Sequence, residues 1–277
     1  MSLISNTGLR RSVIAVVLAA SVGFGMASAK AEDYQMAQVQ NAGAEIWDPL
    51  EGMNRYFFEV NRFLDEIALK PAAAWYGMLP QGARTGVGNA LGNLRTPWTV
   101  VNDGLQGEGT RAGTAIARFF INTLVGFFGV FDPAKEMGLV HHDEDAGQTF
   151  AVWGVDDGPY LMLPVLGSSN GRDLVGIVVD AFLDPFNILV RKADADWASY
   201  ARTGATAVHQ RDANAQQIED LQRSSTDLYA TVRRVTVERR RAEIRNAAPG
   251  SSLPSPRMSD GDGEGIGASG PRAEVPR

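Results

Sequence analysis

One pattern in the sequence could support nucleophilic catalysis. Gly167-Ser168-Ser169-Asn170-Gly171 matches the G-x-S-x-G turn of α/β-hydrolases and lies between an apolar run and a predicted helix. Ser169 would be the nucleophile, and the chain order of the triad leaves His209 as the base. His209 lies in a polar stretch, however, and the chain lacks the alternating strand and helix pattern of a hydrolase sheet. The pattern therefore favours a Gly/Ser-rich turn, and an esterase that uses Ser169 is the enzyme alternative.

Metal-ligating residue types gather in the run His141-His142-Asp143-Glu144-Asp145. Adjacent histidines point to different faces of a helix or a strand, and no H-x-x-x-H spacing follows. The 277 residues include no cysteine, which removes thiolate metal sites, disulfides and cysteine nucleophiles. The stretch 82–92 is rich in glycine but lacks the lysine of a phosphate-binding loop. We therefore expect neither a metal nor a cofactor.

Residues 1–29 have the three parts of a cleaved secretory signal peptide. Arg10 and Arg11 supply the charged start, 13–26 the apolar stretch, and Ala27-Ser28-Ala29 the cleavage site. We expect an exported chain with a flexible linker at 30–45, and without a cysteine it is not lipidated on cysteine. The net charge of −6 argues against nucleic acid as a partner, because nucleic-acid-binding proteins carry a basic surface.

The stretch 48–65, DPLEGMNRYFFEVNRFLD, predicts an amphipathic helix with a wide apolar side. Asp48 suits the N-cap and Pro49 the first helical position. Four polar residues recur at helical spacing and therefore share one narrow face: Glu51, Asn54, Asn61 and Asp65. Such a helix either belongs to a core, with its polar face in solvent, or lies on a lipid surface. This stretch alone leaves both interpretations open.

The most apolar run after the signal peptide, 119–131, is too short to cross a bilayer as a helix, because spanning takes about 20 residues. It predicts either a buried core helix or a segment that lies within one leaflet. Around it, the pattern predicts a break at 68–80 and helices at 81–94, 97–106 and 172–186. Small residues four apart in 81–94 indicate close packing against another helix.

The C-terminal part is polar and helix-favouring. Residues 193–245 predict helices interrupted near Gly204 and at Ser224-Ser225. Leu221, Leu228 and Val235 fall seven apart and predict one apolar stripe. Residues 247–277 are rich in Pro, Gly, Ser and charge, which is typical of a disordered tail.

An ordered set of motifs lies between residues 46 and 245: Asp48-Pro49-Leu50-Glu51 with Asn54-Arg55; Asn102 with Leu105-Gln106; Arg118-Phe119 with Asn122; Gly147-Gln148-Thr149; Trp153-Gly154-Val155; Gly158-Pro159-Tyr160; Arg172-Asp173 with Asp180; and Asp227, Tyr229, Arg233 and Arg240. In this order the motifs resemble the MlaA/VacJ family of outer-membrane proteins.

The resemblance implies an all-α fold over residues 46–246. It would be a ring of amphipathic helices embedded in one leaflet of the outer membrane, around a central amphipathic pore, with a C-terminal helical segment. Phospholipids from the outer leaflet would enter this pore and pass to a periplasmic lipid-binding carrier, with a porin trimer as membrane partner and no covalent chemistry. Asp173, Asp180 and Asn122 are then candidates for lining the lipid path, because an intramembrane acid is tolerated where it faces water.

Under the same resemblance, the polar face of 48–65 reads as contacts between helices of the ring: Glu51, Asn54, Asn61 and Asp65. Two alternatives stay open, a periplasmic lipid esterase that uses Ser169 and a soluble periplasmic scaffold. The sequence also departs from the family pattern. It has no lipobox cysteine, Ala146 replaces a usual Phe, and Ser168 replaces a usual Pro. The chain would therefore hold the membrane by its helices or through a partner.

Overall fold

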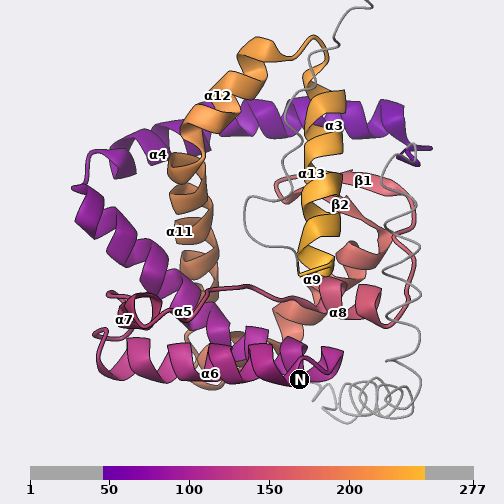
Figure 1. Ribbon diagram of the computed structural model, residues 1–277. Helices are drawn as coiled ribbons and strands as arrows, with labels where there is room; N and C mark the ends of the chain where they lie inside the picture. Colours follow the sequence, from indigo (N-terminus) through magenta and orange to yellow (C-terminus); the bar gives the residue numbers. More distant parts are fainter. Residues whose placement is uncertain (1–45, 247–277) are drawn as a thin grey trace, which may run out of the picture.

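Helices follow one another around a ring in the computed structural model, which describes residues 46–246 (Figure 1). In chain order the elements are α3 (Glu51–Leu64), the π-helix η1 (Asp65–Leu69), α4 (Lys70–Gly77), α5 (Gln81–Gln106), α6 (Gly109–Leu124), α7 (Pro133–Glu136), α8 (Ala146–Val152), β1 (Tyr160–Leu163), β2 (Gly167–Asn170), α9 (Gly171–Leu183), α10 (Pro185–Lys192), α11 (Trp197–Ala213), α12 (Ala215–Ser224) and α13 (Leu228–Ile244). The all-α prediction is confirmed, with one two-stranded hairpin in the described part. The predicted signal peptide, linker and tail lie outside these residues.

The first side of the ring is a continuous helical arc from α3 through η1 to α4 (Figure 1). The predicted start, with Asp48 as N-cap and Pro49 as the first helical residue, is wrong by two residues, because the helix begins at Glu51. The carboxylate of Asp48 instead bonds Asn54, Tyr229 and Arg233. The predicted break at 68–80 shrinks to a turn at its end. Pro71 is accommodated in the first turn of α4, directly after the wide turns of the π-helix.

The next helix, α5, leads from α4 to α6 on the opposite side of the ring (Figure 1). The prediction of two helices, 81–94 and 97–106, is wrong, because α5 runs through Pro97 without a break. A proline in a helix interior costs about 3 kcal/mol, but the neighbouring Thr96, Trp98 and Thr99 are buried, and tertiary packing outweighs the local cost. The helix ends where expected, at Gly107, whose φ of 81° suits glycine.

The apolar run 119–131 divides into the end of α6 and a turn. After Leu124 the chain reverses through Phe127 and Phe128, which both have left-handed backbone conformations. Their side chains are 68% and 73% exposed, and Leu124 is 78% exposed. The buried-core interpretation of this run is therefore wrong. No helix among residues 46–246 is both long and apolar enough to cross a membrane.

A short hairpin and α9 form the side of the ring beside α13 (Figure 1). β1 and β2 pair antiparallel, with Tyr160 opposite Asn170 and Leu163 opposite Gly167. β1 ends at Leu163, directly before Pro164, which has no N–H to donate to a strand partner. The predicted helix 172–186 is observed as α9, and Pro185 starts a separate helix, α10.

Two C-terminal helices, α11 and α13, run between the opposite sides of the ring (Figure 1). The predicted interruption near Gly204 is wrong, because α11 passes through it, whereas the break at Ser224-Ser225 is confirmed. The predicted stripe of Leu221, Leu228 and Val235 is divided between α12 and α13, so it does not lie along one helix.

Burial in this ring is inverted relative to a water-soluble domain. Among the described residues, twelve buried side chains are hydrophobic and six of these are alanines, whereas fifteen are polar or charged. Large apolar side chains are exposed on many helices, including Tyr56, Phe63, Trp75, Phe120 and Phe182. So many exposed large apolar side chains are typical of proteins that bind lipid or other proteins.

Candidate functional site

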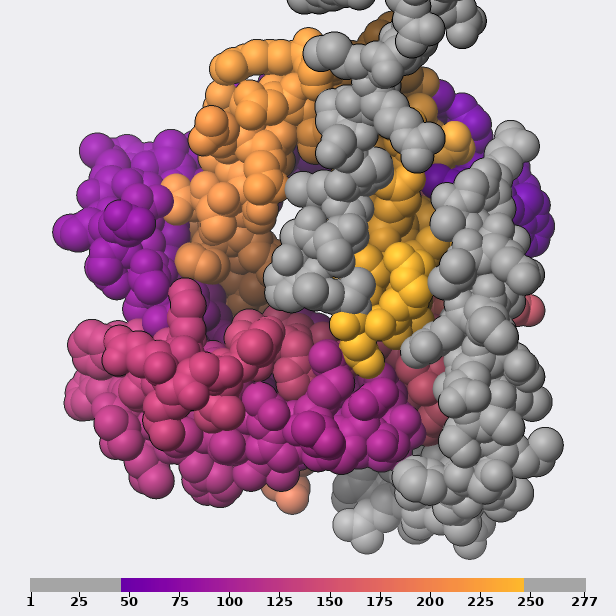
Figure 2. Space-filling model, in the orientation of Figure 1, coloured from indigo at the N-terminus to yellow at the C-terminus, as the bar shows by residue number. Residues whose placement is uncertain are grey.

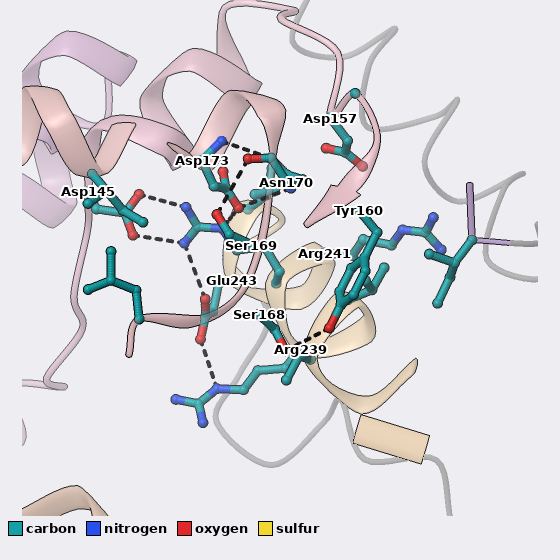
Figure 3. A pocket seen from close by; sticks show the side chains of 18 of the residues that line it. Asp145, Asp157, Tyr160, Ser168, Ser169, Asn170, Asp173, Arg239, Arg241 and Glu243 are labelled. Carbon is teal, nitrogen blue, oxygen red and sulfur yellow. Dashed lines mark hydrogen bonds and ion pairs between the residues drawn. The ribbon is translucent and has the colours of Figure 1, made fainter. Parts of the chain in front are cut away.

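A cavity of about 670 Å³ opens between the hairpin, α9 and α13 (Figure 3). In the space-filling view an opening is visible near the middle of the ring, beside α11 (Figure 2). The cavity lining mixes charge with apolar surface: Ile46, Trp47, Asp145, Asp157, Gly158, Tyr160, Leu166, Ser168, Ser169, Asn170, Asp173, Ile177, Asp180, Gln210, Thr236, Val237, Arg239, Arg240, Arg241, Glu243 and Ile244. It is an amphipathic cavity, suited to a ligand with a polar and an apolar part.

The guanidinium of Arg240 on α13 holds the polar wall together. It donates to both oxygens of Asp145 at 2.7 and 2.8 Å, and its Nε donates to Asp173 at 2.8 Å. Burial would raise the pKa of Asp145, but the bonds from Arg240 outweigh it and hold that pKa below its usual range. Asp173 also accepts a bond from the N–H of its neighbour Arg172 and from Asn170. Arg240 therefore fastens α13 to the start of α8 and of α9.

Asp180 lies about two turns after Asp173 on the same face of α9 and has a different environment. Its Oδ1 accepts from the indole Nε1 of Trp98 at 2.8 Å and from the backbone N–H of Ala146 at 3.0 Å. Burial, together with the negative charge of Asp145, raises the pKa of Asp180 to about 6. The structure thus separates the two predicted lipid-path acids, since Asp173 belongs to an ion cluster while Asp180 has only neutral hydrogen-bond donors.

The third lipid-path candidate, Asn122, is not among the residues that line this cavity. It is buried in α6, where its side-chain amide donates to Asp132 at 2.8 Å and its oxygen accepts from the N–H of Ala134 at 3.1 Å. Arg118 donates to the same Asp132 at 2.7 Å. Asn122 therefore shapes the reversal that exposes Phe127 and Phe128.

The polar face of α3 contacts other elements of the ring. Asn54 is fully buried and bonds the backbone of β1 at Tyr160 and Met162, at 3.0 and 2.9 Å. Asn61 bonds the hairpin turn at the carbonyl of Leu163 and the N–H of Val165.

The two acids of the same face bind arginines. Asp65 accepts two bonds from Arg211 of α11, at 2.8 and 3.2 Å. Glu51 pairs with Arg55 at 2.8 Å and more distantly with Arg233 of α13. Glu51 thus connects α3 with α13, and Asp65, the first residue of η1, connects the end of α3 with α11.

The geometry does not assemble the nucleophile elbow. Ser169 lines the cavity, but its hydroxyl donates to the carbonyl of Asn170 at 3.4 Å. The ring of His209 is held between α4 and α5, with Nδ1 bonded to Tyr76 at 2.9 Å and the opposite edge against Gly88. A Cβ on Gly88 would overlap Nε2 and Cε1 of that ring, so the glycine permits the close approach of α5 and α11.

Within the described residues, no group of three or more His, Cys, Asp or Glu side chains is arranged to hold a metal ion. His142 instead bonds the buried Asp103 at 2.9 Å, and Glu144 accepts from Arg111 at 2.7 Å. Burial raises the pKa of Glu144 above its usual range. This run thus contributes to the packing of the loop before α8 against α5 and α6.

Sequence reasoning missed the contacts that Arg240, Asp145 and Trp98 make at the cavity: Arg240 with Asp145 and Asp173, and Trp98 with Asp180. Arg240 and its two carboxylate partners are 95 and 67 positions apart, so no local spacing connects them. The run Arg239-Arg240-Arg241 was a partial signal. Three consecutive arginines on a packed helix cannot all face solvent, and a buried arginine needs a carboxylate partner.

Comparison with known proteins agrees with this architecture. A family model described as MlaA lipoprotein matches residues 46–243. A Rickettsia felis protein without a functional name is 32% identical over 214 residues, which cover 76% of this chain and 84% of that protein. The intermembrane phospholipid transport system lipoprotein MlaA of Escherichia coli K12 is 33% identical over 203 residues, which cover 69% and 76%.

A solved structure, reported as the structural basis for maintenance of bacterial outer membrane lipid asymmetry, superposes with a TM-score of 0.63 at 34% identity. The match covers 71% of this chain and 98% of that one. The family model and the relatives span the same ring of helices that bears the cavity. The chain belongs to the MlaA lipoprotein family.

Proposed function

We propose that this chain is the outer-membrane component of a phospholipid transport system. It removes mislocalised phospholipids from the outer leaflet and thereby maintains the lipid asymmetry of the outer membrane. The E. coli relative carries the name of such a system, and the related solved structure concerns outer-membrane lipid asymmetry. The ring lies in the periplasmic-facing leaflet after export and cleavage of residues 1–29.

One observation carries the proposal: the ring exposes many large apolar side chains and also contains a charged, amphipathic cavity. Exposed Tyr56, Phe63 and Phe120 would contact acyl chains, while Asp145, Asp180 and Arg240 line a path that a polar headgroup can follow. An amphipathic helix binds one leaflet in proportion to the apolar area it buries there. The lack of a membrane-spanning helix among residues 46–246 is compatible with this one-leaflet position.

The transport route requires two protein partners. A porin trimer would hold the ring in the membrane, and a periplasmic lipid-binding carrier would accept the phospholipid that leaves the cavity. Neither step breaks a covalent bond, so the chain acts as a channel and not as an enzyme. The engagement of Ser169 and His209 with other groups supports this assignment over the esterase alternative.

The proposal is tested in a strain that lacks the gene for this chain. We expect phospholipid to accumulate in the outer leaflet, with increased sensitivity to detergent, and the wild-type gene to restore both. A Ser169→Ala gene should restore them equally. Loss of function in Ser169→Ala together with phospholipid hydrolysis by the purified wild type would establish the esterase instead. Release of the wild-type chain from membranes by a high-salt wash would favour the soluble scaffold.

The acids of the lipid path need separate tests. Asp173 neutralises Arg240, so replacing it perturbs folding as well as any path. Asp180 has no cationic partner within 4 Å among the described residues, and Asp180→Leu therefore tests the path more directly. We expect this variant to be present in the membrane in normal amount and to restore lipid asymmetry only partly.

A further inference from the structure

Among residues 46–246, two charged side chains at or beside the cavity have no oppositely charged hydrogen-bond partner. Asp180 lines the cavity, and its bonds come from neutral donors and reach only its Oδ1, so Oδ2 accepts none from these residues. On helix α5, Arg95 donates no hydrogen bond to the described part of the chain, and its buried Nε has only a long ion pair with Asp143, at 3.8 Å. A guanidinium without hydrogen-bond acceptors is unfavourable, so a ligand that supplied an acceptor to its exposed part would be bound.

The neighbouring acids do not satisfy Arg95. Its nearest carboxylates are Asp143 at 3.8 Å and Asp145 at 3.9 Å, both beyond hydrogen-bond length. Asp145 already uses both oxygens on Arg240. Two-fifths of the Arg95 side chain stays exposed, at 41%. Its Nη2 lies 3.9 Å from Asp145, which lines the cavity, so the partly exposed guanidinium lies beside the cavity wall without a hydrogen bond.

Asp180 and Arg95 also do not neutralise each other. They are near enough to interact electrostatically, but they form no ion pair within 4 Å. A ligand that carries a positive group near a negative group could pair with both, the positive group with Asp180 and the negative group with Arg95. A phospholipid headgroup with an ammonium and a phosphate has this pattern, and its glycerol and acyl chains could continue along Ile177, Val237 and Ile244.

We infer that Asp180 and Arg95 form a recognition site for the headgroup of a zwitterionic phospholipid with a primary ammonium, such as phosphatidylethanolamine. The ammonium donates to Asp180 Oδ2, and the phosphate accepts from Arg95. A quaternary ammonium cannot donate this bond, and an anionic headgroup leaves the carboxylate without a counter-charge. The inference rests on the proposed transport of phospholipids and adds a preference among them.

The test is a competition experiment on the purified full-length chain, with equimolar phosphatidylethanolamine, phosphatidylcholine and phosphatidylglycerol and native mass spectrometry to identify the bound lipid. We expect the wild type to prefer phosphatidylethanolamine by about tenfold, the effect of one charge-assisted hydrogen bond. Asp180→Asn keeps the acceptor for Trp98 and Ala146 and should abolish the preference while lipid stays bound. Arg95→Gln should reduce binding of all three lipids.

Two matched controls make the same chemical changes away from the cavity. Asp156→Asn, in an exposed loop, and Arg223→Gln, on a side chain 74% exposed, should both behave as wild type. Bound lipid without headgroup preference, or a preference that survives in Asp180→Asn, would overturn the recognition site and leave the transport function standing. Failure of the wild type to bind any phospholipid would overturn both.

Discussion

Replacing Arg240 with glutamine tests whether one side chain fastens the C-terminal helix to the ring. Arg240 makes two hydrogen bonds to Asp145 and one to Asp173, and only 15% and 11% of those carboxylate side chains are exposed. Breaking a buried ion pair by removing one partner costs about 3–5 kcal/mol, because a charge stays buried without compensation. Asp173 keeps its bond to Arg172, so the loss falls mainly on Asp145. We therefore expect about 3 kcal/mol.

For a chain of this size, about 3 kcal/mol corresponds to a decrease of roughly 6–12 °C in the unfolding midpoint. The measurement is thermal unfolding of the purified chain in detergent. Arg239→Gln is the matched control, because Arg239 is the adjacent residue, is 70% exposed and pairs with Glu243 alone. An exposed pair contributes about 0–1 kcal/mol, so its midpoint should change by less than roughly 4 °C. Equal shifts in the two variants would refute the argument.

The charge left on Asp145 accounts for the predicted loss. Adding Asp145→Asn to Arg240→Gln should recover part of the midpoint, because the second change removes the uncompensated charge. The pKa of Asp145 is lowered in the folded wild type, so the stability it contributes is present above its unfolded pKa and is lost as the pH falls through the folded one. The difference between wild type and Arg240→Gln should therefore be largest at neutral pH and shrink toward pH 3. A difference independent of pH would contradict this origin.

Three further predictions concern other parts of the ring. The pKa of Asp180 is raised to about 6 in the folded chain, so its contribution to the free energy of unfolding is complete below about pH 4 and is lost as the pH rises through 6. Asp180→Asn should therefore be more stable than wild type by up to about 2–3 kcal/mol at pH 7 and equal to it at pH 4. Unfolding midpoints measured across that pH range test this. Gly88→Ala should destabilise by about 1–3 kcal/mol, since the new Cβ overlaps the ring of His209, and thermal unfolding against Gly82→Ala, where space is open, measures it. Phe127→Ser with Phe128→Ser should weaken binding to phospholipid vesicles by at least tenfold in a flotation assay, because two exposed aromatic side chains are lost, while the unfolding midpoint changes little.

Local signals in the sequence identified most helix ends but not the helices that pass through a breaker. Gly107 ends α5 in the left-handed conformation that glycine favours, and Ser225 ends α12 in an extended conformation. Pro97 and Gly204 were expected to interrupt helices and do not. Thr96, Trp98 and Thr99 beside Pro97 are buried against other elements, and that contribution is invisible to propensity.

The candidate site was located only in part. Helical spacing placed Asp173 and Asp180 on one face of α9, and both line the cavity. Their different roles could not be predicted, because they depend on Arg240 of α13 and Trp98 of α5, which are distant in the sequence. Asn122 was expected on the lipid path from a motif alone, and the structure engages it in the turn after α6.

The polar face of α3 shows how the helices of the ring contact one another through polar residues while their apolar side chains stay exposed. In a soluble helix, Asn54, Asn61 and Asp65 would face solvent; here each binds the hairpin or α11. Hydrogen bonds between elements are stronger where the surroundings have a low dielectric constant, whereas the attraction between apolar faces vanishes in lipid. A helix that lies in a leaflet must therefore use its polar residues for contacts within the protein and leave its apolar side to the acyl chains. The wide apolar face of 48–65 and its four polar residues follow from that single requirement.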